Sequence, residues 1–203
     1  FASLGGDVRM TKRFLQEGSD RFSALVLGSQ GYLGENRMRQ GPGLPGAEAT
    51  FGFNPQGPLR PESDFTFPNA QRAAFAQGIV ALSDQLSITP GLRVEGISTF
   101  AEGTYREVIY DGAGNVVEDS VFQSINEKRR TVLLPGVGVS WKRPFGEWYG
   151  NAVRNFRAVN FSDIQINNLG VVVDPDIGDE RGANFDLGYR TVNETWTLDV
   201  SAF

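Results

Sequence analysis

Apolar and polar residues alternate along several stretches of this chain, which is the pattern of a β-strand with one apolar and one polar face. The alternation is clear in the segment that begins at Leu86. Leu86, Ile88, Leu92 and Val94 share one parity, and Arg93 and Glu95 share the other. The spacing predicts a strand whose four apolar side chains face outward and whose two charged side chains face the concave interior of a sheet.

A second alternation fills the C-terminal end. Phe185, Leu187 and Tyr189 alternate with Asn184, Asp186 and Arg190, and Trp196, Leu198 and Val200 alternate with Thr197, Asp199 and Ser201. The polar segment 191–194 between the two runs predicts a hairpin. We expect Leu198 and Val200 to face outward, and Asp186, Arg190 and Asp199 to face the interior, because a strand presents alternate residues to opposite faces.

The predicted strands are joined by connections that alternate between short and long. We expect strands near residues 2–13, 22–36, 68–82, 86–100, 129–141, 147–156, 184–190 and 195–203. The connections 14–21, 83–85, 142–146 and 191–194 are then short, and 37–67, 101–128 and 157–183 are long. Outer-membrane barrels have short periplasmic turns and long outer loops, whereas recurrent long loops are uncommon in compact soluble domains. The sequence therefore predicts an all-β fold: an antiparallel up-and-down transmembrane β-barrel, of which this chain is a fragment of about eight strands.

Two local features modify this pattern. Pro135 cannot donate a hydrogen bond to a neighbouring strand, so a bulge or an irregular edge is expected there. Within 101–128, Asp111-Gly112 and Gly114-Asn115 predict a small hairpin. Asp111, Asn115 and Asp119 lack the ligand spacing and terminal Glu of an EF-hand, so we expect an ordinary solvated turn and no metal.

The three tryptophans all stand beside short connections. Trp141 and Trp148 flank the segment 142–147, and Trp196 follows the segment 191–194, with Tyr189 just before it. Amphipathic rings gather in a belt at the membrane interface of an outer-membrane barrel. The alternative is that these are ordinary cross-strand aromatic pairs near hairpin ends.

Composition narrows the classes of function. The 203 residues contain no cysteine and no histidine, which excludes disulfides, Cys/His metal sites and histidine-dependent catalysis within them. We expect neither an enzyme nor a cofactor. The net charge of −5 provides no basic field for nucleic acid. No run of about 18 apolar residues predicts a membrane helix, although this test does not detect barrels.

Several phrases in fixed order resemble one protein family. They are "DFTFPNAQRAAFAQ" (64–77), "LSITPGLRVEGI" (86–97), "NAVRNFRAVNFSDI" (151–164) and "VDPDIGDERGANFDLGYR" (173–190). The third and fourth contain Phe156-Arg157-Ala158, Asn160 to Asp163, Asp174-Pro175, Glu180-Arg181 and Asn184 to Arg190. This order resembles the barrel of TonB-dependent outer-membrane receptors, with the ferric dicitrate receptor branch as the nearest likeness, over residues 64 to 203.

The resemblance implies a part of a larger protein. The family's barrel has about twenty-two strands, preceded by a plug domain and an energy-coupling box, so we expect residues 1–203 to be a partial barrel from its middle, without plug and remaining strands. It also implies a receptor in the outer membrane of a Gram-negative bacterium, surrounded by outer-membrane lipid. This receptor would take up a ferric chelate, such as a siderophore or ferric citrate, driven by the TonB energy-transducing complex.

A negatively charged chelate favours guanidinium groups, because the planar fork of Arg matches carboxylates. Candidate ligand-binding residues near the outer rim or on the polar face are Arg37, Arg39, Arg72, Arg93 and Arg157. Each could instead be an ion-pair partner within the barrel or a solvated loop charge. Arg93, with Glu95 two positions away, could belong to an internal ion network.

The end of the loop 157–183, where the chain enters the next predicted strand, is expected to anchor that loop. Glu180 and Arg181 are expected at the rim, where they anchor the loop 157–183 by charge-assisted hydrogen bonds rather than bind substrate.

Two other classes of protein stay open. One is a soluble β-rich carbohydrate-binding or adhesion domain, which Gly-, Asn- and Asp-rich turns would suit. The other is a hydrolase with paired carboxylates, Asp174/Asp176 or Asp179/Glu180. Adjacent acids on a loop are usually solvated turn residues, so the catalytic interpretation is the weaker one.

Overall fold

The computed structural model describes residues 2–15, 22–42, 61–159 and 176–203, which form one sheet of eight strands. The strands are β1 (Ala2–Leu15), β2 (Phe22–Gln40), β3 (Ser63–Ala81), β4 (Leu86–Tyr110), β5 (Val116–Arg143), β6 (Gly146–Arg157), β7 (Glu180–Val192) and β8 (Thr197–Ala202). In these ranges, no helix is long and apolar enough to cross a membrane.

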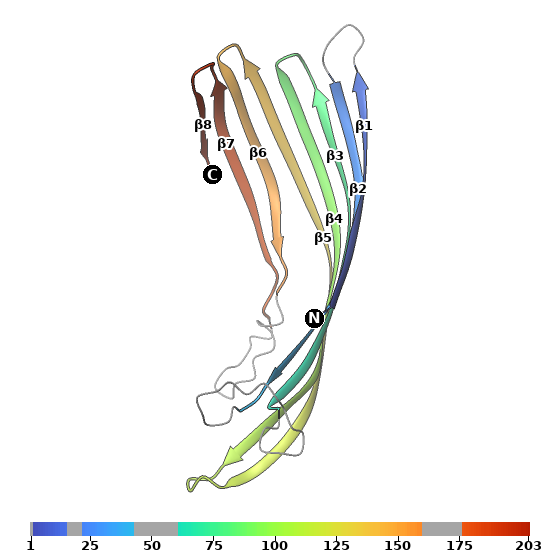
Figure 1. Cartoon of the computed structure of the whole chain (residues 1–203), viewed down its shortest axis with the longest axis vertical. Helices are drawn as coiled ribbons and strands as arrows, with labels where there is room; N and C mark the ends of the chain where they lie inside the picture. The colour runs from blue at the N-terminus through green and yellow to red at the C-terminus, as the bar shows by residue number, and fades with distance from the viewer. Residues whose placement is uncertain (1, 16–21, 43–60, 160–175) are drawn as a thin grey trace.

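The strands follow one another across the sheet in chain order, and every neighbouring pair is antiparallel. The connections β3–β4, β5–β6 and β7–β8 lie at one end of the sheet, which we call the turn end, and the β4–β5 connection lies at the opposite, outer end (Figure 1). The up-and-down order and the placing of the short connections at one end are confirmed. The predicted connections 14–21, 37–67 and 157–183 fall largely outside the described residues.

The predicted loop 101–128 is wrong, because two strands continue through most of it. β4 runs to Tyr110 and β5 begins at Val116, which leaves only the small turn that Asp111-Gly112 predicted. Cross-strand pairs explain the extension: the rings of Tyr105 and Phe122 stack with centroids 5.4 Å apart. Arg106 also donates to Asp119 across the same pair of strands at 2.6 Å. Such pairs stabilise a ladder by about 0.2–1 kcal/mol each, even where no apolar face is buried.

The sheet divides beside Pro135. β5 pairs with β6 only from Gly136 to Arg143, whereas its pairing with β4 continues through Pro135, opposite Leu92, to the outer end. A proline has no N–H to give to a second neighbour, so the β6 ladder stops at the residue next to it. As a result, β6 and β7 separate from β5 toward the outer end (Figure 1).

The two faces of the sheet differ in packing. Among the described strand residues, the buried apolar ones share the concave inner face: Ala24, Phe65, Phe67, Ala73 and Ala101. The rings of Phe65 and Phe67 stack at 6.1 Å, and Tyr105 packs against them. Side chains converge on the concave face of a curved sheet and diverge on the convex face. This small cluster is therefore the nearest thing to a core in the described residues.

Candidate functional site

The convex outer face carries a wide apolar band. Leu4 and Val8 of β1 are 74% and 73% exposed there. Other large exposed apolar residues on the same face are Met10, Leu25, Leu27, Leu33, Val80, Leu92, Val94, Leu133, Val137, Val139, Phe185, Leu187, Leu198 and Val200. A soluble protein rarely exposes so large a contiguous apolar surface, whereas a membrane barrel presents one to lipid.

A row of aromatic residues forms the border of this apolar band at the turn end of the sheet. Trp141, Trp148 and Tyr189 are successive register partners on β5, β6 and β7, all on the outer face. Trp148 and Tyr189 lie with ring centroids 4.9 Å apart, and the Tyr189 hydroxyl donates to the Phe145 carbonyl at 2.7 Å. The row is thus both a set of cross-strand pairs and an aromatic border at one level, as expected of an interfacial belt.

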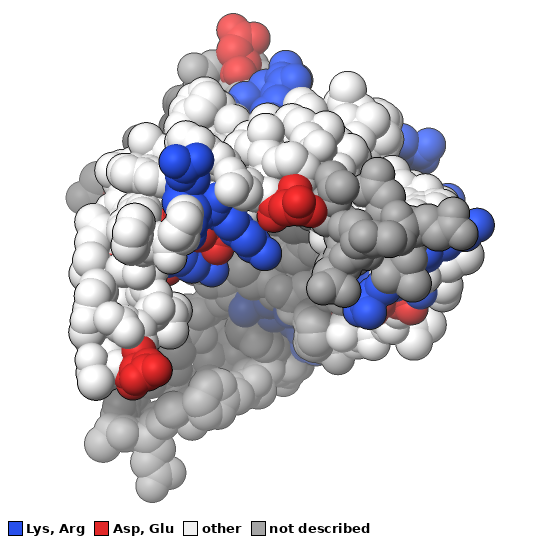
Figure 2. All heavy atoms as spheres, turned by 90° about the horizontal axis from the view of Figure 1, so that it is seen from above, with Lys and Arg blue, Asp and Glu red and all other residues white. Residues whose placement is uncertain are grey.

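The inner face is polar by comparison, and its side chains bond mainly to one another. Register places Arg93, Glu95, Asp186, Arg190 and Asp199 on this face, as the alternation predicted, and places Leu86, Ile88, Leu92, Val94, Leu198 and Val200 on the other. Seen from above, the wall curves around a hollow that both basic and acidic side chains border (Figure 2). A polar interior with an apolar exterior is the arrangement of a barrel that encloses water or a hydrophilic ligand.

A cluster at mid-height of the inner face centres on Phe75. Its ring lies over Gly28, where an added Cβ would collide with the ring. The guanidinium carbons of Arg9 and Arg93 lie 5.7 and 5.9 Å from the ring centroid. Arg93 also donates to Glu95, and to Gln30 at 3.0 Å. Arg93 is thus part of an internal ion network, which was the alternative interpretation for this residue.

A second polar cluster lies on the inner face near the turn end. Glu147 accepts from Ser140 and lies 3.6 Å from the Arg190 guanidinium. Arg190 stacks over the Tyr149 ring at 4.5 Å, and the Tyr149 hydroxyl donates to Asp199 at 2.6 Å. These contacts link β5, β6, β7 and β8, so the polar layer fastens the strands together as well as lining the hollow.

A third group fixes the segment before β7 to the inner face of β5. Arg130 and Asp179 form an ion pair of 2.7 Å, and their side chains are only 7% and 15% exposed. Lys128 donates to the Ile177 carbonyl at 2.9 Å, and the Val159 amide donates to Asp179 at 3.1 Å. The chain that enters β7 is therefore held across the gap that opens beside Pro135.

Glu180 contributes to the same anchoring, and Arg181 does not. Glu180 pairs with Arg157, its register partner on β6, at 2.8 Å. Arg181 pairs in register with Phe156 and is exposed on the outer face. The sequence-based role thus fits Glu180 alone, and the buried partner of Arg130 is the preceding Asp179. Neither Asp179 nor Glu180 is placed as a free catalytic carboxylate, and Asp174 lies outside the described residues.

The five predicted ligand-binding arginines fall into two groups. Arg93 and Arg157 lie on the inner face of β4 and β6. Arg37, Arg39 and Arg72 lie on the outer face, and Arg37 donates to Asp64 at 2.6 and 2.8 Å, with Arg39 4.0 Å from the same carboxylate. The structure therefore does not bring all five together, although a ligand role for any of them stays a prediction.

The outer end of the sheet carries charged pairs and a capped turn. The hydrogen bond from Arg37 holds the pKa of Asp64 below its ordinary value, against the opposing effect of partial burial. In the β4–β5 turn, Asp111 accepts from the backbone amides of Ala113 and Asn115 and from the Asn115 side chain. These bonds, the last of them foremost, lower the pKa of Asp111. Gly114 has φ of 85°, as such a turn requires. Asp111 thus shapes the turn.

Sequence reasoning missed Arg9, Lys128 and Arg130 as residues of the inner face. Arg129 and Arg130 are adjacent, and period-two alternation sends one outward and the other inward. Only the register of β5 against β4, with Arg130 opposite Ile97, decides which of them is buried. Assigning the inward and outward parity of residues 116–143 from the sequence would have placed Arg130 on the inner face.

Comparisons with known proteins agree with this geometry. The chain matches the family model of the TonB dependent receptor-like β-barrel over residues 5–203. The crystal structure of the ferric yersiniabactin uptake receptor FyuA from Yersinia pestis matches with a TM-score of 0.61 and 13% identity, and covers 98% of this chain and 28% of FyuA. The closed form of the ferric-catecholate import receptor Fiu from E. coli K12 matches with a TM-score of 0.65 and 14% identity, over 98% of this chain and 30% of Fiu.

At this low identity, the two structures establish a common fold and no more. The chain spans less than a third of either receptor. No curated protein sequence matches it. The match to the family model, in contrast, extends over nearly the whole chain and coincides with an antiparallel sheet that is apolar outside and polar inside. The chain belongs to the TonB-dependent receptor-like β-barrel family.

Proposed function

We propose that this chain forms part of the barrel wall of an outer-membrane receptor for energy-coupled uptake of a ferric chelate. The observation that carries the proposal is the two-faced wall: an apolar outer band bordered by an aromatic row, and a charged inner face on which arginines stand among carboxylates. FyuA and Fiu, which share the fold, are named as receptors for ferric yersiniabactin and ferric catecholates. The membrane location, the chelate and the coupling to the TonB complex are parts of the proposal.

The inner face suits an anionic chelate better than a neutral sugar. Arg9, Arg93, Arg130 and Arg157 all lie on it, and a guanidinium binds carboxylate or catecholate oxygens with two parallel hydrogen bonds. Glu95, Asp179 and Glu180 form ion pairs with three of these arginines. We propose Arg93 and Arg157 as ligand contacts, since they are the predicted residues on this face.

The exposed apolar band also favours a membrane receptor over a soluble carbohydrate-binding domain. A soluble domain would need to cover the apolar band that β1 to β8 present on the outer face, because exposed apolar patches of that extent drive association. A receptor in the membrane covers the band with lipid and needs no further partner for it.

Uptake in intact cells tests the proposal. Cells that lack the full-length receptor, complemented with the wild type or with variants, are supplied with iron-55 as ferric citrate, a ferric catecholate or ferric yersiniabactin. We expect receptor-dependent uptake of one chelate class that stops when the proton gradient is collapsed. Uptake of ferric citrate would support the ferric dicitrate branch. A receptor that fractionates as a soluble protein, or that confers no uptake of any chelate, would contradict the proposal.

Arg157→Gln and Arg93→Gln test the ligand contacts, with Arg37→Gln on the outer face as the matched control. Loss of one good charge-assisted contact costs about 1.5–3 kcal/mol, which is roughly a tenfold to hundredfold loss of chelate affinity. The control is expected to bind as the wild type does. Equal affinity in all three variants would remove Arg93 and Arg157 from the site.

A further inference from the structure

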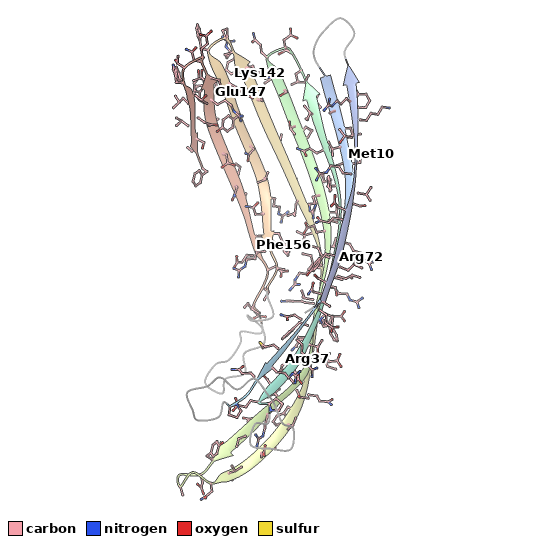
Figure 3. All side chains as sticks on the ribbon, viewed as in Figure 1. Met10, Arg37, Arg72, Lys142, Glu147 and Phe156 are labelled. Atoms are coloured by element: carbon pink, nitrogen blue, oxygen red, sulfur yellow. The ribbon has the colours of Figure 1, made fainter. Side chains whose placement is uncertain are left out.

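Residues at mid-height of the inner face form a row that crosses the first five strands at one level. The row consists of the successive register partners Arg9, Gly28, Phe75, Arg93 and Leu134. Met10, the next residue of β1, lies on the convex side of the wall (Figure 3). Because successive strand residues point to opposite faces, Arg9 lies on the concave side, which borders the hollow.

The Phe75 ring lies between two guanidinium groups of this row. Gly28 has no side chain, which leaves space for the ring over its backbone. The guanidinium carbons of Arg9 and Arg93 are 5.7 and 5.9 Å from the ring centroid. Both distances are within the range of about 6 Å over which a cation is attracted to an aromatic face. The ring therefore keeps two positive charges close to each other on the inner face.

The two arginines differ in the partners that they already have. Arg93 is paired with Glu95 and donates to Gln30 at 3.0 Å. Arg9 is exposed, and its guanidinium has no ion pair with any residue in the described ranges, Asp7 on the same face of β1 included. An anionic ligand at Arg9 therefore replaces no carboxylate, whereas a ligand at Arg93 has to compete with one.

A hollow of about 390 Å³ lies beside the row. Phe75 and Leu134 contribute apolar surface to its lining, Gln77 contributes an amide group, and Gly91 has no side chain to fill the space. An apolar cavity of about 150 Å³ already accommodates benzene. The hollow thus has room for an aromatic ring, with apolar surface for the ring and guanidinium groups for an attached anionic oxygen.

We propose that this hollow binds an aryl oxyanion, a phenolate or catecholate ring of the ferric chelate, with its oxygens on Arg9 and its ring against Phe75. This assignment rests on the proposed function and deepens it by naming the class of chelate. A guanidinium binds anionic oxygens through two parallel hydrogen bonds, and an aromatic ring packs favourably against Phe75. Citrate and hydroxamate chelates offer the anionic oxygens without the ring, so they leave the apolar lining uncovered.

Asp7 also lines the hollow, and it narrows the choice of ligand further. Its carboxylate repels a compact anion such as inorganic phosphate. The same carboxylate can accept a hydrogen bond from a hydroxyl or amide group that stands beside the anionic oxygen on an aryl ring. The mixed charge of the lining therefore favours a substituted aromatic anion over a small, highly charged one.

The test measures equilibrium binding of iron-55 chelates to the purified full-length receptor. The probes are a ferric tris-catecholate, ferric citrate and a ferric hydroxamate, of which only the first has aryl rings. The variants are Arg9→Gln, Phe75→Leu and Phe75→Tyr. The matched control is Lys12→Gln, because the Lys12 ammonium also lies over an aromatic ring of β1, that of Phe14 at 5.3 Å, but on the outer face. Arg9→Gln removes no ion pair, so it decides the matter even if Phe75→Leu does not fold.

We expect the wild type to bind the ferric catecholate at least about tenfold more tightly than the other two chelates. Arg9→Gln should lower catecholate affinity roughly tenfold or more. Phe75→Leu should lower it about two- to tenfold, without a matching loss for ferric citrate. Phe75→Tyr, which keeps the ring, and the control should bind within about twofold of the wild type.

Three results would overturn the assignment. They are wild-type catecholate affinity in Arg9→Gln, an equal loss of all three chelates in Phe75→Leu, and a wild type that prefers ferric citrate or the hydroxamate. If cells with the receptor take up ferric citrate and not the catecholate, only this inference fails. A receptor that confers no uptake of any chelate refutes the proposed function, and this inference with it.

Discussion

The buried ion pair between Arg130 and Asp179 gives the sharpest prediction about the wall. Asp179→Asn keeps the shape of the side chain and its acceptor oxygen but removes its charge. The two groups lie 2.7 Å apart with side chains 7% and 15% exposed. Their attraction at an effective dielectric constant of 20 is about 6 kcal/mol before desolvation is subtracted. Breaking one side of a buried pair costs about 3–5 kcal/mol, because the partner charge stays buried.

Glu180→Gln is the matched control, because it breaks the neighbouring pair with Arg157, whose side chains are 59% and 68% exposed. An exposed pair contributes about 0.2–1 kcal/mol. The assay is amide hydrogen exchange at the start of β7 in the folded full-length receptor, which reports the free energy of local opening. A loss of about 3 kcal/mol speeds exchange roughly a hundredfold in Asp179→Asn, and less than about tenfold is expected in the control.

A double variant separates charge burial from general disruption. Replacing both partners by apolar residues, Arg130→Met with Asp179→Leu, removes the unpaired charge and should restore the opening free energy to within about 1 kcal/mol of the wild type. Equal exchange rates in Asp179→Asn and Glu180→Gln would show that the pair does not hold this segment. A double variant no better than Asp179→Asn would show that the charge is not the cause.

Three further predictions follow from the same contacts. Gly28→Leu should displace the Phe75 ring and cost about 1–3 kcal/mol of barrel stability in thermal unfolding, whereas Gly31→Ala, where the space is open, should cost less than about 1 kcal/mol. The contribution of Asp64 to stability is measured as the difference in unfolding free energy between the wild type and Arg37→Gln. This difference should be constant from pH 8 to 5. It should be lost only as the pH falls below the ordinary carboxyl pKa of about 3.9, because its folded pKa is lowered. Cysteine at Ala113 should react with a membrane-impermeant maleimide on intact cells, and cysteine at Phe145 should not, since the two turns lie at opposite ends of the sheet.

The parity of the strands could be predicted wherever one face is purely apolar. From Leu86 to Val94 the apolar residues occupy one parity without exception. The single assumption that this parity faces outward therefore placed Arg93 and Glu95 correctly on the inner face. The stretch around Arg72 lacks this alternation, because both parities are apolar there. Ala73 and Phe75 occupy one parity, and Ala74 and Ala76 occupy the other. Only the pairing of β3 with β4 shows that Phe75 turns inward and Arg72 outward.

Strand length could not be predicted beyond the apolar band. Where a strand extends past the apolar band, neither face needs to be apolar, and the period-two signal disappears although the ladder continues. This happens in β4 and β5, whose outer parts are held by the Tyr105–Phe122 stack and the Arg106–Asp119 pair. Pairs of this kind join residues whose spacing along the chain depends on the turn position, which the sequence indicated only through Asp111-Gly112.

The inner-face arginines differ in how readily they could serve an anionic ligand. Arg93 is bound by Glu95 and Gln30 and sits beside the Phe75 ring, so a chelate must compete with a carboxylate that is itself fixed by Gln71 at 3.1 Å. Arg157 is paired with an exposed carboxylate, Glu180, in a contact of the kind that contributes only about 0.2–1 kcal/mol. A ligand that replaces Glu180 therefore gives up less than one that replaces Glu95. Of the two proposed ligand contacts, we therefore expect Arg157→Gln to lower chelate affinity more than Arg93→Gln does.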